Sequence, residues 1–296
     1  MNLAHYAFIP SPSRNGFYIG PLFFHAYGIC YVFAVAAAIL ITQRRWRARG
    51  GDPELVYKAA WWGFPAGLVG GRLYFVITTP SQMHHTWWGP FAIWDGGLGI
   101  WGGIAGGAAV GIWRLKKVMT WDDIYRFMNC VAPALLVAQA IGRIGNYFNQ
   151  ELFGKPSTLP WALKISPEHR PPGYLHYATF QPSFLYELIW DLALAAVLVL
   201  IEKRGKLRPP ALFPLYVAGY SAYRIFEETI RIDYSQHILG MRLNFWIAGI
   251  GTVAGLACFA RIQFRQRAPL AYLVDATRST DGSSEPARPS AKPAAR

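Results

Sequence analysis

Charged residues are scarce in this chain. Asp, Glu, Lys and Arg make up 15% of its 296 residues, whereas an ordinary soluble domain carries about 25%. Hydrophobic residues make up 53%, yet the mean hydropathy is only +0.19, so the apolar residues must be concentrated in segments that more polar loops separate. This composition excludes an ordinary soluble domain and indicates an integral membrane protein.

Cysteine is rare as well, with three residues in the chain. Cys30, Cys130 and Cys258 lie in three different apolar segments, and no CxxC pair or histidine spacing typical of a metal site accompanies them. We interpret them as small core residues. We therefore expect no metal and no organic cofactor.

Seven apolar segments are candidates for membrane spans. The clearest is residues 22–41, a run of 20 residues without Lys, Arg, Asp or Glu, which matches a hydrocarbon core of about 30 Å. No basic region and cleavage site precede it, so we expect it to stay in the membrane. Because several segments carry a charge or are rich in glycine, a re-entrant element could replace one span. The other six are residues 59–77, 96–113, 127–148, 184–201, 209–226 and 243–260.

The position of the positive charges predicts the orientation. Basic clusters follow the first, third, fifth and seventh segments, whereas the connections after the second and fourth hold few basic residues. The positive-inside rule then places the N-terminus outside and the C-terminus in the cytoplasm, which requires an odd number of spans. Membrane orientation, and not nucleic-acid binding, thus explains the net charge of +13. The clusters are Arg44, Arg45, Arg47 and Arg49; Arg114, Lys116 and Lys117; Lys203, Arg204, Lys206 and Arg208; and Arg261, Arg265 and Arg267.

The predicted fold is all-α, a polytopic transmembrane helix bundle of seven spans over residues 1–262. Within it, residues 149–182 contain six prolines and are too long for a plain connection, so we expect them to form an extracytoplasmic cap. Residues 263–296 are rich in Ala, Pro, Ser and Arg without apolar periodicity. They predict a basic, disordered cytoplasmic tail.

Polar residues inside the segments gather at the outer ends of the predicted spans, while the inner halves are almost purely apolar. Single side chains at helix ends could snorkel to lipid headgroups. Snorkelling would decorate both ends of a bundle similarly, so a buried polar site near the outer leaflet explains the set better. The residues are His25, Tyr27, Arg72, Asp95, Arg143, Asn146, Asn149, Glu151, Gln181, Tyr186, Glu187, Tyr220, Arg224, Glu227, Glu228 and Asn244.

The densest polar segment is residues 142–154, which read GRIGNYFNQELFG. An arginine in a setting of low dielectric can bind a phosphate through two hydrogen bonds, so Arg143 and Arg224 are candidates to grip one together. Two other glycine-rich stretches, residues 67–71 and 102–107, have the spacing of closely packed membrane helices. We assign those two to helix packing.

The segment GRIGNYFNQELFG resembles the motif of prolipoprotein diacylglyceryl transferases. Further blocks of that family are matched in the same order, and the resemblance covers residues 20–260. These blocks are HAYG (residues 25–28), GGRLYF (70–75), WDGGLGIWGG (94–103), QPSFLYE (181–187) and GYSAYRIFEETIR (219–231).

The resemblance implies an enzyme of a bacterial cytoplasmic membrane with its active site on the extracytoplasmic side. Such enzymes transfer the diacylglyceryl group of phosphatidylglycerol to the lipobox cysteine that follows the signal peptide of a preprolipoprotein, and glycerol phosphate is released. The implied partners are therefore phosphatidylglycerol, the signal peptide with its lipobox, and the lipid bilayer. The implied catalytic residues are Arg143, Arg224, Tyr27, His25 and Glu151. The implied phosphatidylglycerol-binding residues are Arg143, Asn146, Asn149, Gly154, Arg224, Tyr220 and Glu228.

One position departs from the family pattern. Many members have a histidine, proposed as the catalytic base, where this sequence has Trp101. Either His25 takes the thiol proton, or the positive field of the arginines and bulk water suffice for a thiol of pKa about 8.5. We expect Glu151, Glu187 and Glu228 to orient the arginines and not to abstract protons.

A transporter or a lipid-binding scaffold is the alternative class, since seven spans and intramembrane charges suit it as well. Alternating access requires a site near the midplane of the bilayer with a route to both sides. The apolar inner halves of the predicted spans argue against such a route.

Overall fold

The computed structural model describes residues 8–80, 86–92, 97–205, 207–233 and 235–264. The chain divides into a compact unit that ends at Gln263 and a second unit that starts at Phe264, and the fold is that of the first unit. Asp95 and the predicted tail beyond Phe264 lie outside the described residues.

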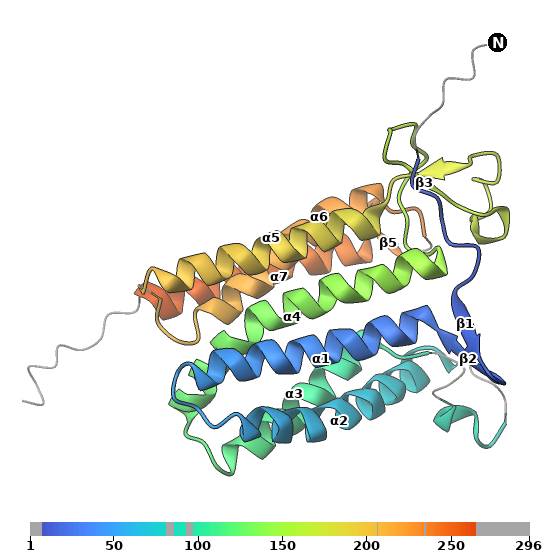
Figure 1. The fold of residues 1–296 in the computed structure, drawn as a ribbon. Coiled ribbons are helices and arrows are strands. Elements are labelled where there is room, and N and C mark those ends of the chain that lie inside the picture. The colour runs from blue at the N-terminus through green and yellow to red at the C-terminus, as the bar shows by residue number, and fades with distance from the viewer. Residues whose placement is uncertain (1–7, 81–85, 93–96, 206, 234, 265–296) are drawn as a thin grey trace, which may run out of the picture. The chain divides into compact units, whose positions relative to one another are not determined.

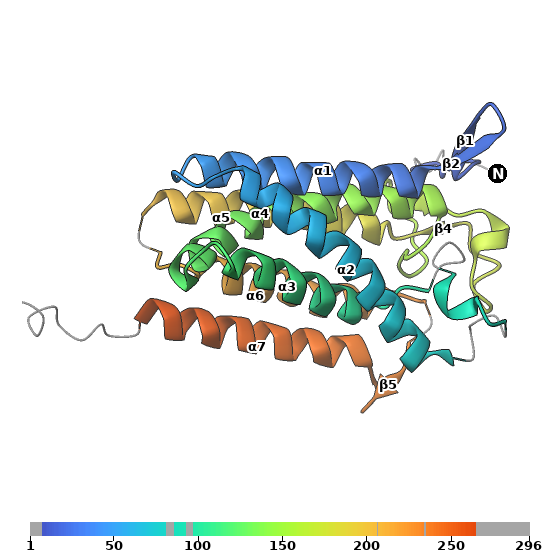
Figure 2. The same cartoon turned by 90° about the horizontal axis from the view of Figure 1, so that it is seen from below.

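Seven α-helices, one for each predicted apolar segment, make up most of the fold. Figure 1 shows α1 beside α4 and α4 beside α5, and in Figure 2 α2 lies beside α3. Four helices, α1, α4, α5 and α7, are long and apolar enough to cross a membrane, whereas α2, α3 and α6 are shorter or less apolar. The helices are α1 (Ala26–Arg47), α2 (Glu54–Thr78), α3 (Ile100–Lys116), α4 (Trp121–Asn149), α5 (Ser183–Lys203), α6 (Leu212–Ile230) and α7 (Leu243–Phe264).

The start of the first predicted span is wrong by four residues. Residues 22–25 form strand β2 (Leu22–His25), which pairs with β1 (Gly16–Ile19) in an antiparallel hairpin, and α1 begins only at Ala26. Gly20 has a φ of 59° and precedes Pro21 in the turn. This turn reverses the chain, and aromatic residues such as Phe23 and Phe24 fit a strand well. The apolar run therefore did not by itself indicate where the helix begins.

Helix α4 begins six residues before the predicted segment. Its N-terminus has a capping box, in which the Thr120 hydroxyl accepts from Asp123 N and the Asp123 carboxylate accepts from Thr120 N. These bonds satisfy backbone donors that a helix start leaves free, so the helix extends beyond its apolar part.

Helices α2 and α3 pack through glycines, as predicted. A Cβ atom built on Gly70 would lie 2.4 Å from the carbonyl oxygen of Gly102, and one on Gly102 would lie 2.2 Å from the carbonyl oxygen of Gly70. Gly99 N also donates to Gly71 O across the interface at 2.8 Å. The two backbones are therefore too close for any side chain larger than hydrogen at these positions.

The end of the bundle that holds the predicted cytoplasmic loops contains an acid as well as basic residues. Glu202 binds Arg45 at 2.5 Å and Arg49 at 2.6 Å, and Arg45 Nε donates to Cys130 O at 3.2 Å. Asn129 Oδ1 accepts from Leu212 N at 3.1 Å. These contacts join α1, α4, α5 and α6, so this end is more than the simple basic cluster that the sequence suggests.

The cap (residues 149–182) is folded around its own apolar core, at the same end of the bundle as the β1–β2 hairpin (Figure 1). Phe153, Leu163, Ile165 and Phe180 are buried together. Ile9 N donates to Ala162 O at 2.8 Å, so the N-terminal segment is tied to the cap. The remaining short elements are β3 (Leu163–Lys164), β4 (Thr179–Phe180), β5 (His237–Ile238), β6 (Met241–Arg242), η2 (Gly89–Phe91) and η4 (Pro167–His169).

The glycine interface generates a stability prediction. We expect Gly70→Ala to lower the midpoint of thermal unfolding in detergent and to cost about 1–3 kcal/mol, because the new methyl group would overlap backbone that can move only if the helices separate. Gly249→Ala in α7 is the matched control, since a Cβ atom there would meet nothing within 4 Å. Equal midpoints for the two variants would contradict this account.

Candidate active site

The centre of the site is Glu187, on the second turn of α5 and fully buried. Its Oε1 lies 2.6 Å from Arg143 Nη2 of α4, and its Oε2 lies 3.6 Å from Arg224 Nη1 of α6. The hydroxyl of Tyr220 donates to the same Oε1 at 3.0 Å. The arginine side chains remain 19% and 15% exposed. Two cations thus share one carboxylate, and neither arginine side chain is fully buried.

The motif residues at the end of α4 form a chain of side-chain hydrogen bonds. Arg143 Nη1 donates to Asn146 Oδ1 at 3.3 Å, and Asn146 Nδ2 donates to Glu151 Oε1 at 2.8 Å. Asn149 Nδ2 reaches the same oxygen at 3.2 Å. Gln150 ends the helix with a φ of 52°, which turns the chain so that Glu151 N reaches Asn146 O at 3.2 Å. The left-handed turn is what brings Glu151 back to the helix.

Tyr27 and His25 lie at the same end of the bundle but contact different groups. The ring of Tyr27 packs on Gly145, where an added Cβ would lie 2.6 Å from Tyr27 Cδ2. His25 is exposed, and its ring meets the edge of Phe23 at a centroid distance of 4.7 Å. Within the described residues no hydrogen bond joins His25 to the arginines. Trp101 is half-exposed on the first turn of α3.

Gly154 joins the cap to α6. Its N donates to Gln181 O at 2.9 Å, and a Cβ there would lie 3.0 Å from Gln181 Cβ and 3.2 Å from Ile230 O. The next residue, Lys155, donates its N to Ile230 O at 2.9 Å. The structure therefore places Gly154 at a close approach of two chain segments.

Arg224 has further carboxylate partners on its own helix. Its guanidinium is hydrogen-bonded to Glu227 and to Glu228, both of which are buried. Arg242 of β6, 8% exposed, binds the other oxygen of Glu228 through Nε at 2.6 Å. Sequence reasoning missed Arg242, because an arginine just before an apolar segment usually marks a helix end facing water.

Asp233 continues this network outside the helices. It binds Arg231 Nε at 2.7 Å and Arg242 Nη2 at 3.0 Å. Arg242 Nη1 also donates to the backbone oxygen of Asp233 at 2.7 Å. Charged contacts therefore run without interruption from the end of α4 through α5 and α6 to the start of α7.

Asp191 is a second residue that sequence reasoning missed. It lies one helical turn beyond Glu187 on α5 and is fully buried, and within the described residues neither carboxyl oxygen has a hydrogen-bond partner. An acid in the middle of the apolar segment 184–201 is the signal that could have found it.

Arg72 lies on α2 and binds the connection between α2 and α3. Its guanidinium donates to Pro90 O at 2.9 Å, Gly97 O at 3.0 Å and Gly89 O at 2.6 Å. Backbone carbonyls of the connection between α2 and α3 thus bind this arginine.

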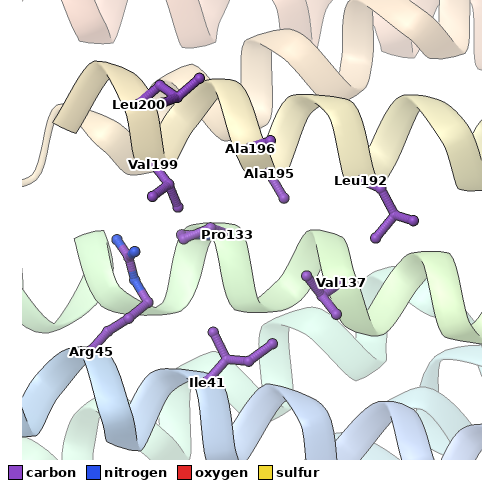
Figure 3. Close-up of a pocket in the computed structure, with 9 residues that line it drawn as sticks. All are labelled: Ile41, Arg45, Pro133, Val137, Leu192, Ala195, Ala196, Val199 and Leu200. Atoms are coloured by element: carbon purple, nitrogen blue, oxygen red, sulfur yellow. The ribbon is translucent and has the colours of Figure 1, made fainter. Parts of the chain in front are cut away.

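A pocket of about 420 Å³ lies between α1, α4 and α5, away from these residues (Figure 3). Its lining is apolar except for Arg45, and none of the predicted site residues contributes to it. Among the described residues no group of three or more His, Cys, Asp or Glu side chains could hold a metal ion. The predicted site residues that the structure brings together are therefore those of the network around Glu187.

The Asp233 contacts generate a prediction on pH. Burial raises the pKa of Asp233, but the hydrogen bonds and charges of Arg231 and Arg242 lower it more, so the pKa lies below its ordinary value. The stabilisation is complete above the ordinary pKa of about 3.9 and is lost as the pH falls through the lower pKa of the folded protein.

We therefore expect Asp233→Asn to lower the midpoint of thermal unfolding at pH 7. The difference from the unmodified protein should shrink as the pH is lowered below about 4. Asp122→Asn, at an exposed position, is the control and should change the midpoint little at any pH. A difference that stays constant down to pH 3 would show that the ion pairs are not its source.

Comparison with known proteins identifies the family of this chain. The model of the prolipoprotein diacylglyceryl transferase family matches residues 14–261. A phosphatidylglycerol-prolipoprotein diacylglyceryl transferase of Frankia alni is 43% identical over 95% of this chain and 77% of its own. Relatives of the same name in Streptomyces coelicolor and Cutibacterium acnes are 43% and 46% identical, over 85% and 80% of this chain and 80% of each relative. The chain therefore belongs to the prolipoprotein diacylglyceryl transferase family.

Proposed function

We propose that this chain transfers the diacylglyceryl group of phosphatidylglycerol to a cysteine thiol of a prolipoprotein, the first step of lipoprotein maturation. The S–H bond and the bond between glyceryl carbon and phosphate oxygen break, a thioether bond forms, and glycerol phosphate leaves. The observation that carries the proposal is the pair Arg143 and Arg224, held by one buried carboxylate at the end of the bundle that carries the family motif.

The two arginines bind the phosphate of the lipid and stabilise the charge that develops on it as the carbon–oxygen bond breaks. Because Glu187 fixes both guanidinium groups before substrate arrives, little reorganisation is needed during the reaction. A guanidinium has five N–H donors, so each arginine has donors beyond those bound to carboxylates that can bind phosphate oxygens.

The other site residues position this pair. The end of α4 is held around Arg143 by hydrogen bonds among Asn146, Asn149 and Glu151. Tyr220 orients Glu187 through its hydroxyl, and Glu228 orients Arg224. Tyr27 of α1 packs on Gly145 of α4 and thereby holds α1 against the site. Gly154 lets the cap approach α6. Glu187, Glu151 and Glu228 serve as partners of cations or amides, since a carboxylate paired with a cation is a weak base.

The thiol proton has two candidate acceptors. His25 ends β2, two residues before Tyr27, and an exposed imidazole can exchange protons with water. The alternative is loss of the proton directly to water, helped by the positive field of the arginines. Trp101 has no basic group and cannot serve.

We also propose that all seven helices span a bacterial cytoplasmic membrane, with the N-terminus and the cap outside. This orientation places the arginine pair near the outer leaflet, where the cap can admit the lipobox segment that follows the signal peptide. Residues 1–262 would then form the transferase, and residues 263–296 a basic cytoplasmic tail.

Arginine 143 provides the first test. We expect Arg143→Ala to lower transfer of labelled diacylglycerol from phosphatidylglycerol to a lipobox peptide by about 100- to 1,000-fold, because one donor to the developing charge is lost. Arg49→Ala, which breaks an ion pair at the opposite end of the bundle, is the control and should keep most of the activity. Undiminished turnover of Arg143→Ala would refute its role.

Analysis of the products distinguishes the transferase from the alternative function, a transporter or lipid-binding scaffold. The purified protein should release glycerol phosphate from phosphatidylglycerol only when the peptide is present. Lipid binding or movement without any release would favour the alternative.

The pH dependence of the transfer rate tests which group accepts the thiol proton. If His25 is the base, His25→Gln should lower the rate and should change the shape of the pH–rate profile. Unmodified protein in the same detergent is the reference. Superimposable profiles of equal height would exclude His25 and leave water as the acceptor.

A further inference from the structure

The β1–β2 hairpin has apolar side chains on both faces. Phe17 and Phe24 stack at 6.1 Å, and Tyr18 and Phe23 pair at 4.8 Å. Several of these side chains are strongly exposed, including Tyr18 at 68%. A hairpin of two strands with no buried face gains little stability in water, so its sequence is better explained by a partner.

One hydrogen bond at the base of the hairpin shows which residue pairs are hydrogen-bonded and which are not. Ala26 N donates to Asn15 O at 2.8 Å, next in register to the pair of Gly16 and His25. In an antiparallel ladder hydrogen-bonded and non-hydrogen-bonded pairs alternate, so Phe23 and His25 belong to non-hydrogen-bonded pairs. Their N–H groups therefore point away from β1, along the outer edge of β2.

This outer edge has no backbone hydrogen-bond partner within the described residues. Acyl chains cannot satisfy backbone N–H and C=O groups, whereas an extended peptide can. The edge also contains no Lys, Arg, Asp or Glu, which suits an uncharged segment.

The edge of β2 leads directly to the site. After His25 the chain enters α1, and Tyr27 on the first turn packs on Gly145, two residues from Arg143 along α4. A strand added beside Phe23 and His25 would thus end next to the arginine pair. Strand addition gives affinity through main-chain bonds and leaves the side chains of the added peptide free to carry the reacting group.

We propose that the outer edge of β2 binds the cysteine-bearing segment of the polypeptide substrate as an added β-strand. The proposal rests on the proposed transferase function and names the surface that recognises its second substrate. The peptide main chain pairs with Phe23 and His25, and its cysteine is delivered towards Arg143.

Phe23→Pro tests this edge, because it removes the backbone N–H of residue 23, which points away from β1, and leaves the hydrogen bonds to β1 intact. Phe23→Val retains the N–H but loses the ring, and it is the reference. We expect Phe23→Pro to have a KM for a synthetic lipobox peptide about five- to tenfold above that of Phe23→Val. The KM for phosphatidylglycerol and kcat at saturating peptide should agree within about twofold.

The opposite edge supplies the matched control. The backbone N–H of Tyr18 points away from β2 along the outer edge of β1, so Tyr18→Pro makes the same chemical change there. It should match Tyr18→Val in every constant. Equal peptide KM values for Phe23→Pro and Phe23→Val would overturn the proposal, and so would a change confined to the KM for phosphatidylglycerol, which would assign the edge to lipid.

A peptide series with the unmodified protein keeps the test valid if Phe23→Pro does not fold. Single N-methyl groups are placed along the peptide on either side of the cysteine. Strand pairing requires KM to rise at alternate residues, since only every second N–H faces β2. No effect, or an effect without this period, overturns strand addition. Absence of transfer to the unmethylated peptide would instead refute the transferase function itself.

Discussion

The carboxylate of Glu187 is the group on which the organisation of this bundle depends. It lies fully buried between Arg143 and Arg224, and it links α5 to α4 on one side and to α6 on the other. A buried charge without a partner costs several kcal/mol, so removing any member of this set leaves the others in an unfavourable state. The three helices are therefore fixed at the depth at which the reaction is proposed to occur.

The other half of the bundle is held together by a different principle. Helices α2 and α3 approach through glycine backbones, for example at Gly70 and Gly102, and Gly99 donates its N–H directly to Gly71. Close packing needs no charge and tolerates no added volume. The contacts between α4, α5 and α6 at the site thus depend on ion pairs, whereas the close approach of α2 and α3 depends on the lack of side chains at their glycines.

The sequence predicted the helices well because long apolar runs are typical of helices that can cross a membrane. It also predicted that Arg143, Glu187 and Arg224 lie together, because ionisable residues inside apolar segments are rare and need partners. It failed where local chemistry overrides hydrophobicity. Residues 22–25 are apolar yet form a strand, since Gly20 and Pro21 turn the chain. Helix α4 starts earlier than its apolar run because Thr120 and Asp123 cap it.

The prediction of the site was limited for a related reason. Arg143 and Arg224 stood out because an arginine in an apolar segment demands an explanation. Arg242 did not, since an arginine in a short loop is ordinary, and only the fold brings it to Glu228 and Asp233. Partners that are distant in sequence leave no trace in local composition.

The network also bears on how product could leave the proposed site. Four cations are paired with carboxylates in this network. The cations are Arg143, Arg224, Arg231 and Arg242, and the carboxylates are Glu187, Glu227, Glu228 and Asp233. Their charges are thus largely balanced before a lipid arrives, and a phosphate binds to the free N–H groups of already paired guanidinium groups. Unpaired arginines would bind the more highly charged glycerol phosphate still more tightly than the lipid, and would retain it. An enzyme that binds its product tightly turns over slowly. The carboxylates keep the arginines oriented and also weaken their affinity for glycerol phosphate, so the product can leave.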